Sequence, residues 1–167
     1  MKWLAALLLA LAPAGAFAAP KAITRLDTGW QVRIAPSDKA AAAAHPRAAR
    51  WIPATVPGSV QQDLIAAGLV PDPYRGTNEG AIQWAGLTDW EWKRTMTVTP
   101  AMLAADHLDL VFDGLDTFAE VRVNGTLLLA ADNAHRRWRA DAKPLLRSGV
   151  NEITVVIASP IRRLQPM

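Results

Sequence analysis

Hydrophobic and polar residues alternate in several short blocks along this chain. The clearest block spans residues 90–98, where Trp90, Trp92 and Met96 alternate with charged and hydroxyl side chains. An alternation with a period of two predicts strands that have one face on a core and the other in water. The same pattern predicts strands over residues 30–34, 108–112, 119–123, 126–129 and 153–157.

Turn signals separate the predicted strands. Asn124-Gly125 stands between two apolar runs and predicts a β-hairpin, because both residues tolerate a positive φ. With Thr126 the same pair forms a sequon for N-glycosylation, although the turn is the preferred interpretation. Many short strands with turns between them predict an all-β fold, for which we expect a jelly-roll β-sandwich with short connecting helices.

Residues typical of helix termini predict one helix between residues 59 and 68. Ser59 can cap it, Gln62 completes a capping box three residues later, and Gly68 stands where a left-handed residue is favoured. This helix is expected to close one end of the sheets. Further segments expected outside the strands are short helical turns over residues 100–105 and after Asp141, and an exposed insertion over residues 40–46.

The first 18 residues predict a signal peptide. A short positive end precedes an apolar run over residues 4–11, and Ala16-Phe17-Ala18 supplies small residues around a cleavable bond. Pro13 and Gly15 interrupt the apolar stretch, which is shorter than the about 20 residues of a membrane-spanning helix. We therefore expect residues 19–167 to form one β-sandwich domain that is exported, periplasmic or secreted, with no membrane anchor after cleavage.

Composition narrows the classes of function. The 167-residue chain has 51% hydrophobic residues and a net charge of +3, which favours a packed core and gives no case for a nucleic-acid partner. A barrel of eight β/α units needs about 250 residues and is excluded at this length. The sequence contains no cysteine, which excludes disulfides, thiolate metal sites and cysteine nucleophiles.

The sequence shows no pattern for catalysis, a metal or a cofactor. Its three histidines are scattered without ligand spacing, and it has no phosphate-binding loop or nucleophile motif. Glycoside hydrolysis needs only two carboxyl groups, so Glu79 with Asp89 and Asp113 with Asp116 are conceivable pairs. Asp113 and Asp116 are better interpreted as turn residues. We therefore predict no catalytic residue, no metal and no cofactor in this chain.

Aromatic residues and one polar loop suggest a binding role. Trp30, Trp90 and Trp92 take alternating strand positions and are expected in the core. Trp84 lies in an irregular stretch and is a candidate for stacking on a sugar ring. Residues 71–80 are dense in turn formers and polar groups, typical of a loop that presents side chains at the rim of a β scaffold. A plain surface loop is the alternative.

Three runs occur in a characteristic order. They are residues 51–64 with Val-Pro-Gly-Ser, residues 71–84 with Pro-Asp-Pro-Tyr and Gln-Trp, and residues 112–125 with Gly-Leu-Asp-Thr and Asn-Gly. In this order they resemble the N-terminal sugar-binding domain of family 2 glycoside hydrolases, and most closely that of β-mannosidases. The resemblance spans nearly the whole chain after the signal peptide and implies a galactose-binding-domain-like jelly roll, in agreement with the periodicity.

The resemblance also implies which residues meet sugar. The two catalytic glutamates of this family belong to a later β/α barrel, which we expect to lie outside this sequence. Asn78 looks like an asparagine that related galactosidases place at the edge of the sugar pocket, and Glu79 and Trp84 are carried over with it as substrate-binding residues. The implied partners are β-linked mannosides or related oligosaccharides, and the missing catalytic domains of the same polypeptide.

Several interpretations of function remain open at this point. The first is the non-catalytic N-terminal domain of a β-mannosidase-like glycoside hydrolase, which supports hydrolysis of terminal β-mannosyl residues. The alternatives are a free-standing carbohydrate-binding module, the N-terminal domain of an exo-β-glucosaminidase, and a structural subunit or decaying reading frame. The sequence shows no row of exposed aromatics of the kind that a free-standing module would be expected to carry.

Overall fold

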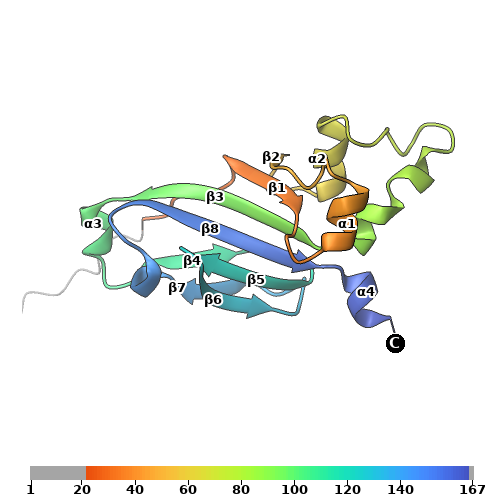
Figure 1. The fold of residues 1–167 in the computed structure, drawn as a ribbon. Helices are drawn as coiled ribbons and strands as arrows, with labels where there is room; N and C mark the ends of the chain where they lie inside the picture. The colour runs from red at the N-terminus through yellow and green to blue at the C-terminus, as the bar shows by residue number, and fades with distance from the viewer. Residues whose placement is uncertain (1–21, 166–167) are drawn as a thin grey trace, which may run out of the picture.

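Two antiparallel sheets dominate the computed structural model, which describes residues 22–165 (Figure 1). The predicted signal peptide, residues 1–18, lies outside the described residues. Every neighbouring pair of strands is antiparallel. The larger sheet has the order β2 (Ile52–Ala54), β1 (Trp30–Ile34), β3 (Trp90–Val98), β8 (Gly149–Ala158), β5 (Phe118–Val123) and β6 (Thr126–Ala131), and the smaller sheet pairs β4 (Asp109–Phe112) with β7 (Trp138–Asp141).

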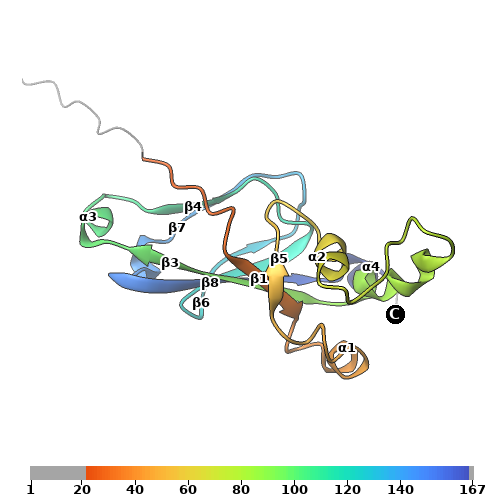
Figure 2. The ribbon, with the colours of Figure 1, turned by 90° about the horizontal axis from the view of Figure 1, so that it is seen from above.

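The main core lies between the two sheets. Figure 2, which is turned by 90° from Figure 1, shows β4 in a separate layer from β3 and β8. Side chains from both layers meet there, with Leu110 of β4 packed in one cluster with Trp30, Val121 and Ile153 of the larger sheet. Trp30 is only 7% exposed, which confirms its predicted core position. The expectation of an all-β sandwich with short helices is thus confirmed.

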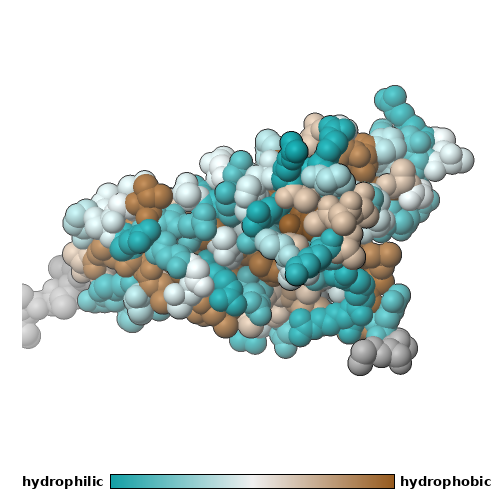
Figure 3. Space-filling model, in the orientation of Figure 1, coloured by the Kyte–Doolittle hydropathy of each residue, from teal (hydrophilic) through white to brown (hydrophobic). Residues whose placement is uncertain are grey.

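The outer face of the larger sheet is polar, as the alternation predicts. On β1 and β3, Arg33 and Glu91 form an ion pair with Nε and Oε2 2.8 Å apart. The ring of Trp51 lies beneath Arg33 and Lys93, whose cationic groups are 4.2 and 4.3 Å from its centroid. The face seen in Figure 3 is mostly hydrophilic, with hydrophobic residues in separate small groups.

Helices gather at one end of the larger sheet and cover a second core. They are α1 (Lys39–Ala44), α2 (Val60–Ala66), η1 (Asn78–Ala81), η2 (Gln83–Leu87) and α4 (Pro160–Leu164), while α3 (Pro100–Leu103) lies at the opposite end (Figure 1). The second core joins Ile34 and Trp90 from the sheet to Leu64 and Ile82 from the helical end. None of the helices within residues 22–165 has the length and hydrophobicity that crossing a bilayer requires.

The start of α2 follows the predicted capping box. Ser59 Oγ accepts from the Gln62 N–H at 3.4 Å, and Gln62 Oε1 accepts from the Ser59 N–H at 3.3 Å. These two bonds satisfy amide groups that a helix leaves without partners in its first turn. Gly68 follows the helix with a φ of 63°, as its position predicts.

The predicted hairpin joins β5 to β6 through Asn124 and Gly125, which have φ values of 51° and 82°. The side chain of Asn124 also bonds outside the turn. Its Nδ2 donates to the carbonyl oxygen of Leu145 and to Oδ1 of Asn151, both at 2.8 Å, and its Oδ1 accepts from the Glu152 N–H at 3.1 Å. The amide nitrogen of the sequon is therefore engaged in structure, which favours the turn interpretation.

Two short strands were missed by the sequence pattern, whereas two expected connecting segments are present. β2 and β7 were not predicted, because β2 has only three residues around Pro53 and β7 carries an arginine and an aspartate in four residues. The short helical turn expected after Asp141 is confirmed as η3 (Lys143–Leu145), and Asp141 Oδ1 accepts from the Lys143 N–H at 3.0 Å. The alanine-rich run, expected as an exposed insertion, has no buried residue between Lys39 and Ala44 and is helical as α1, because buried Asp38 caps it by accepting from the Ala41 N–H.

Asp63 on α2 is a buried carboxyl group with one unsatisfied oxygen. Oδ1 accepts from the Thr55 N–H at 2.9 Å, whereas Oδ2 has no hydrogen-bond partner among residues 22–165. Burial raises the pKa of Asp63 and outweighs the bond from Thr55. At Asp63 the folded chain holds a proton that the unfolded chain releases. The contribution of this group to the free energy of unfolding therefore falls as pH rises from about 4 through its folded pKa, and is constant above it.

We expect Asp63→Asn to remove this pH dependence. The neutral amide keeps the acceptor for Thr55 and avoids burying a charge, so the variant should be at least as stable as the parent at pH 7. Asp63→Ala, the comparison variant, lacks the acceptor, and its free energy of unfolding should be lower than that of the parent by about 1 kcal/mol. Urea unfolding between pH 4 and pH 8 measures both, and an equal loss in the two variants at pH 7 would contradict the assignment.

Candidate functional site

The segment between α2 and β3 carries all three predicted sugar-contact residues. It follows α2 and buried Val70, forms η1 and η2, and joins the larger sheet at Trp90. Pro71 and Pro73 and the polar groups around them prevent regular pairing, so the segment turns over the helical end of the fold. Its placement at the rim of the β scaffold confirms the expected loop.

Asn78 opens η1 and is half-buried. Its Nδ2 donates to the carbonyl oxygen of Asp72 at 3.1 Å, and this bond fixes the orientation of the amide. Asp72 shapes the same turn through its side chain, because Oδ1 accepts from the Tyr74 N–H at 3.0 Å. The turn before η1 is therefore held by one aspartate, which bonds through its side chain to Tyr74 and through its carbonyl oxygen to Asn78.

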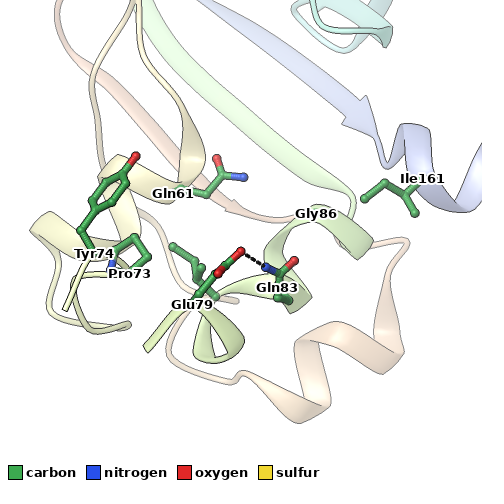
Figure 4. A pocket seen from close by; sticks show the side chains of 8 residues that line it. Gln61, Pro73, Tyr74, Glu79, Gln83, Gly86 and Ile161 are labelled. Carbon is green, nitrogen blue, oxygen red and sulfur yellow. Dashed lines mark hydrogen bonds between the residues drawn. The ribbon is translucent and has the colours of Figure 1, made fainter. Parts of the chain in front are cut away.

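Glu79 follows on the same short helix and is exposed. Its Oε1 accepts from Nε2 of Gln83, one helical turn later, at 3.4 Å. Figure 4 shows the two side chains meeting over a pocket. Of the three predicted contact residues, Glu79 is the one that lines this pocket.

Trp84 points into the helical end of the fold. Its ring is stacked on His45, with centroids 3.6 Å apart and planes 11° from parallel, and it lies 5.7 Å from the ring of Trp90. It is half-buried and packs against the second core. The structure thus brings Asn78 and Glu79 together on η1 and places Trp84 in an aromatic stack behind them.

The pocket beside η1 has a volume of about 530 Å³ (Figure 4). Most of the lining comes from residues 73–86, whereas Gln61 of α2 and Ile161 of α4 could not be placed beside that segment from the sequence. The spacing of four between Glu79 and Gln83 was the one signal that could have linked two of them. The lining consists of Gln61, Pro73, Tyr74, Glu79, Ile82, Gln83, Gly86 and Ile161.

The conceivable catalytic pairs have separate partners. Glu79 meets Gln83, whereas Asp89 accepts from the Ser159 N–H at 2.7 Å and pairs with Arg162. Asp113, whose side chain is 88% exposed, pairs with Arg137. Asp116 accepts from the hydroxyl of the neighbouring Thr117, the local bonding that its sequence context predicts. None of these contacts arranges two carboxylates around a shared substrate position.

A protein-family model matches most of the chain. The model described as glycosyl hydrolase 2 galactose-binding domain-like covers residues 30–167. The chain belongs to this glycosyl hydrolase 2 family. The resemblance drawn from the three sequence runs is therefore confirmed at the level of the family, and its matched range includes both sheets and the η1–η2 segment.

Individual members of the glycosyl hydrolase 2 family resemble the chain at high coverage. β-Mannosidase B of Thermothelomyces thermophilus is 34% identical over 146 residues, which are 87% of this chain and 16% of that protein. β-Mannosidase B of Aspergillus terreus is 38% identical over 122 residues, which are 72% of this chain and 13% of that protein. The chain thus spans about one sixth or less of the length of these relatives.

Solved structures agree with the glycosyl hydrolase 2 assignment. β-D-Mannosidase from Dictyoglomus thermophilum matches with a TM-score of 0.73 and 34% identity, over 83% of this chain and 16% of that one. The exo-chitosanase of Amycolatopsis orientalis matches with a TM-score of 0.65 but only 22% identity, over 78% of this chain and 16% of that one. The second likeness supports the fold alone, so the similarity favours the β-mannosidase branch.

Proposed function

We propose that this chain acts as the non-catalytic N-terminal domain of a β-mannosidase-like glycoside hydrolase and supports the hydrolysis of terminal β-mannosyl residues. The observation that carries the proposal is the 34% identity with β-mannosidase B over 87% of the chain. The similarity of fold and sequence to a solved β-D-mannosidase supports it independently. The partners are then a β-linked mannoside and the catalytic domains of such an enzyme.

The chemistry of the chain suits a supporting role. The two conceivable carboxylate pairs, Glu79 with Asp89 and Asp113 with Asp116, each have separate partners. The acid and the nucleophile that glycoside hydrolysis requires would therefore come from the catalytic domains. Asn78 supplies an amide at the rim of the fold, held by Asp72. An amide can donate to one sugar hydroxyl and accept from its neighbour, which is the contribution that the family resemblance implies for Asn78.

The test places this chain in a working enzyme. We would replace the corresponding domain of Dictyoglomus thermophilum β-D-mannosidase with it and measure kcat/KM for an aryl β-mannoside. Asn78→Ala should lower kcat/KM about tenfold or more, because a hydrogen bond to the sugar is lost where water is excluded. Asn133→Ala, on the exposed β6–β7 connection, is the matched control and should leave kcat/KM unchanged. Equal values for the two variants would refute the role of Asn78.

Export is the second part of the proposal. It is supported by the pattern of the first 18 residues, a positive end followed by an apolar run and small residues around a cleavable bond. An exported glycosidase would meet oligosaccharides outside the cytoplasm. Periplasmic or secreted placement is therefore the location that fits the proposed activity.

A further inference from the structure

The pocket beside η1 is open to the surface on one side and is bounded by well-packed residues on the other. Ile82 at its base is only 8% exposed and belongs to the second core. Gly86 is held from α4, because its carbonyl oxygen accepts from Ser159 Oγ at 2.7 Å. A Cβ at Gly86 would lie 3.2 Å from Cδ1 of Ile161, so the helix and the loop approach closely here. The base of the pocket is therefore fixed by packing against the second core and by contacts with α4.

Polar side chains converge above the base of the pocket. Gln61 reaches in from α2, while Glu79 and Gln83 rise from η1 and η2, and Figure 4 shows their amide and carboxylate ends directed toward the same space. The bond between Glu79 and Gln83 is 3.4 Å long, at the weak end of the hydrogen-bond range. A hydroxyl group placed between the two could replace it with shorter bonds to both.

An aromatic ring borders the same space. Tyr74 lines the pocket and is 96% exposed, so almost none of its surface is used in packing within the domain. Exposed aromatic rings at loop tips offer a face for the C–H groups of a ligand and a hydroxyl for a further hydrogen bond. Pro73 and Ile161 extend the apolar border on either side.

The lining selects the class of ligand. Two amides and one carboxylate supply donors and acceptors in pairs, which suits adjacent hydroxyl groups. No lysine or arginine is among the residues that line this pocket, and the carboxylate of Glu79 would repel an anion. A volume of about 530 Å³ lies within the range of about 300–1,000 Å³ of small-molecule sites. The ligand that fits is neutral, rich in hydroxyls and apolar on one face.

We infer that this pocket binds one pyranose ring of an oligosaccharide, with Gln61, Glu79 and Gln83 bonding its hydroxyls and Tyr74 covering its apolar face. This inference rests on the proposed function, because it takes the ligand to be part of a β-mannoside chain. It adds a binding site on the domain itself, formed by α2 and the η1–η2 segment. Asn78 and Trp84 are not needed for it.

The test is a binding titration on the purified chain. Side-chain amide signals of Gln61 and Gln83 would be followed by ¹⁵N NMR while β-1,4-linked mannotriose is added. Both signals should shift along one saturable curve. Gln61→Ala and Gln83→Ala should each raise the Kd about 3–10-fold, the value of one lost hydrogen bond, and Tyr74→Ala should raise it by a similar factor.

Matched controls keep the result interpretable. Gln31→Ala removes an exposed amide on the outer face of β1 and should leave the Kd unchanged. The backbone spectrum of each variant outside the pocket shows whether the fold persists. Amide signals that do not move up to saturating trisaccharide, or a Kd that is the same in Gln61→Ala, Gln83→Ala and Gln31→Ala, would overturn the inference.

The two proposals can fail separately. If Asn78→Ala lowers kcat/KM in the chimaeric enzyme while the chain binds no mannotriose, the supporting role stands and the pocket inference is overturned. If the pocket binds mannotriose and Gln61→Ala weakens it while Asn78→Ala leaves kcat/KM unchanged, the pocket inference stands and the role of Asn78 is overturned.

Discussion

Asn151→Ala should lower the free energy of unfolding by about 3 kcal/mol, because four hydrogen bonds meet at this side chain. Nδ2 donates to the carbonyl oxygens of Arg147 at 2.7 Å and Gly149 at 3.0 Å. Oδ1 accepts from the Arg147 N–H at 2.9 Å and from Asn124 Nδ2 at 2.8 Å. The side chain is 1% exposed, so water cannot replace these bonds.

Thermal and urea unfolding measure this effect. A loss of this size should lower Tm by roughly 6–12 °C in a domain of this length. Asn133→Ala is the matched control, because Asn133 is exposed and its Oδ1 accepts only the local His135 N–H at 2.9 Å. It should change stability by less than about 0.5 kcal/mol. Similar losses in both variants would show that the Asn151 network contributes little.

Asp38→Ala should lower the free energy of unfolding by about 2–3 kcal/mol, because Asp38 is a buried group that links three segments. Asp38 accepts from the N–H groups of Ala41 at 3.2 Å and Asp89 at 3.1 Å, and its Oδ2 lies 2.9 Å from Nη2 of Arg162. It thereby joins α1, the start of β3 and α4 at the helical end of the fold.

The loss should depend on pH in a defined direction. Burial by itself raises the pKa of Asp38, but the two N–H groups and the Arg162 guanidinium outweigh it, so the pKa lies below its usual value. A carboxyl group with a lowered folded pKa stabilises the chain above its unfolded pKa of about 3.9, and this contribution disappears as pH falls through the folded pKa. The difference in free energy of unfolding between the parent and Asp38→Ala should therefore be constant from pH 5 to pH 7 and shrink below pH 4.

Urea unfolding at pH 3 to pH 7 tests this expectation. Asp27→Ala serves as the control, because the Arg25–Asp27 pair is 82% and 42% exposed and should contribute little. Asp38→Asn keeps a hydrogen-bond acceptor but not the charge. Its free energy of unfolding should lie between those of the parent and Asp38→Ala. A difference that grows on acidification would show that the sign of the pKa shift is wrong.

The strands and helices that could be predicted are those whose local sequence pattern matches the burial and hydrogen bonding of the same residues in the folded chain. Alternation identified β3 because Trp90, Trp92 and Met96 all pack in or against the two cores. The capping box identified α2 because both its bonds are local. β2 and β7 escaped prediction because they are short strands whose pairing depends on partners distant in sequence, such as Ile52 opposite Val32 and Trp138 opposite Phe112. Three residues of β2 are too few to show a period of two, and Arg139 and Asp141 of β7 interrupt any apolar alternation there.

The candidate site was predicted only in part, for a similar reason. The density of turn formers located the loop, and the family resemblance selected Asn78 and Glu79 within it. Gln61 and Ile161 carried no signal, because only the folded chain brings α2 and α4 to the same pocket. Trp84 stood out by lying between predicted strands, yet η2 turns its ring onto His45. Its contact with sugar stays a prediction.

The position of β8 has a consequence for the order in which the chain is made. Of the strands within residues 22–165, β8 is synthesised last, but it lies in the middle of the larger sheet, paired with β3 on one side and β5 on the other. Before residues 149–158 leave the ribosome, β2-β1-β3 and β5-β6 are separate ribbons, each with an unpaired edge. Nascent chains of this domain would therefore need protection from aggregation until that final strand joins the two ribbons.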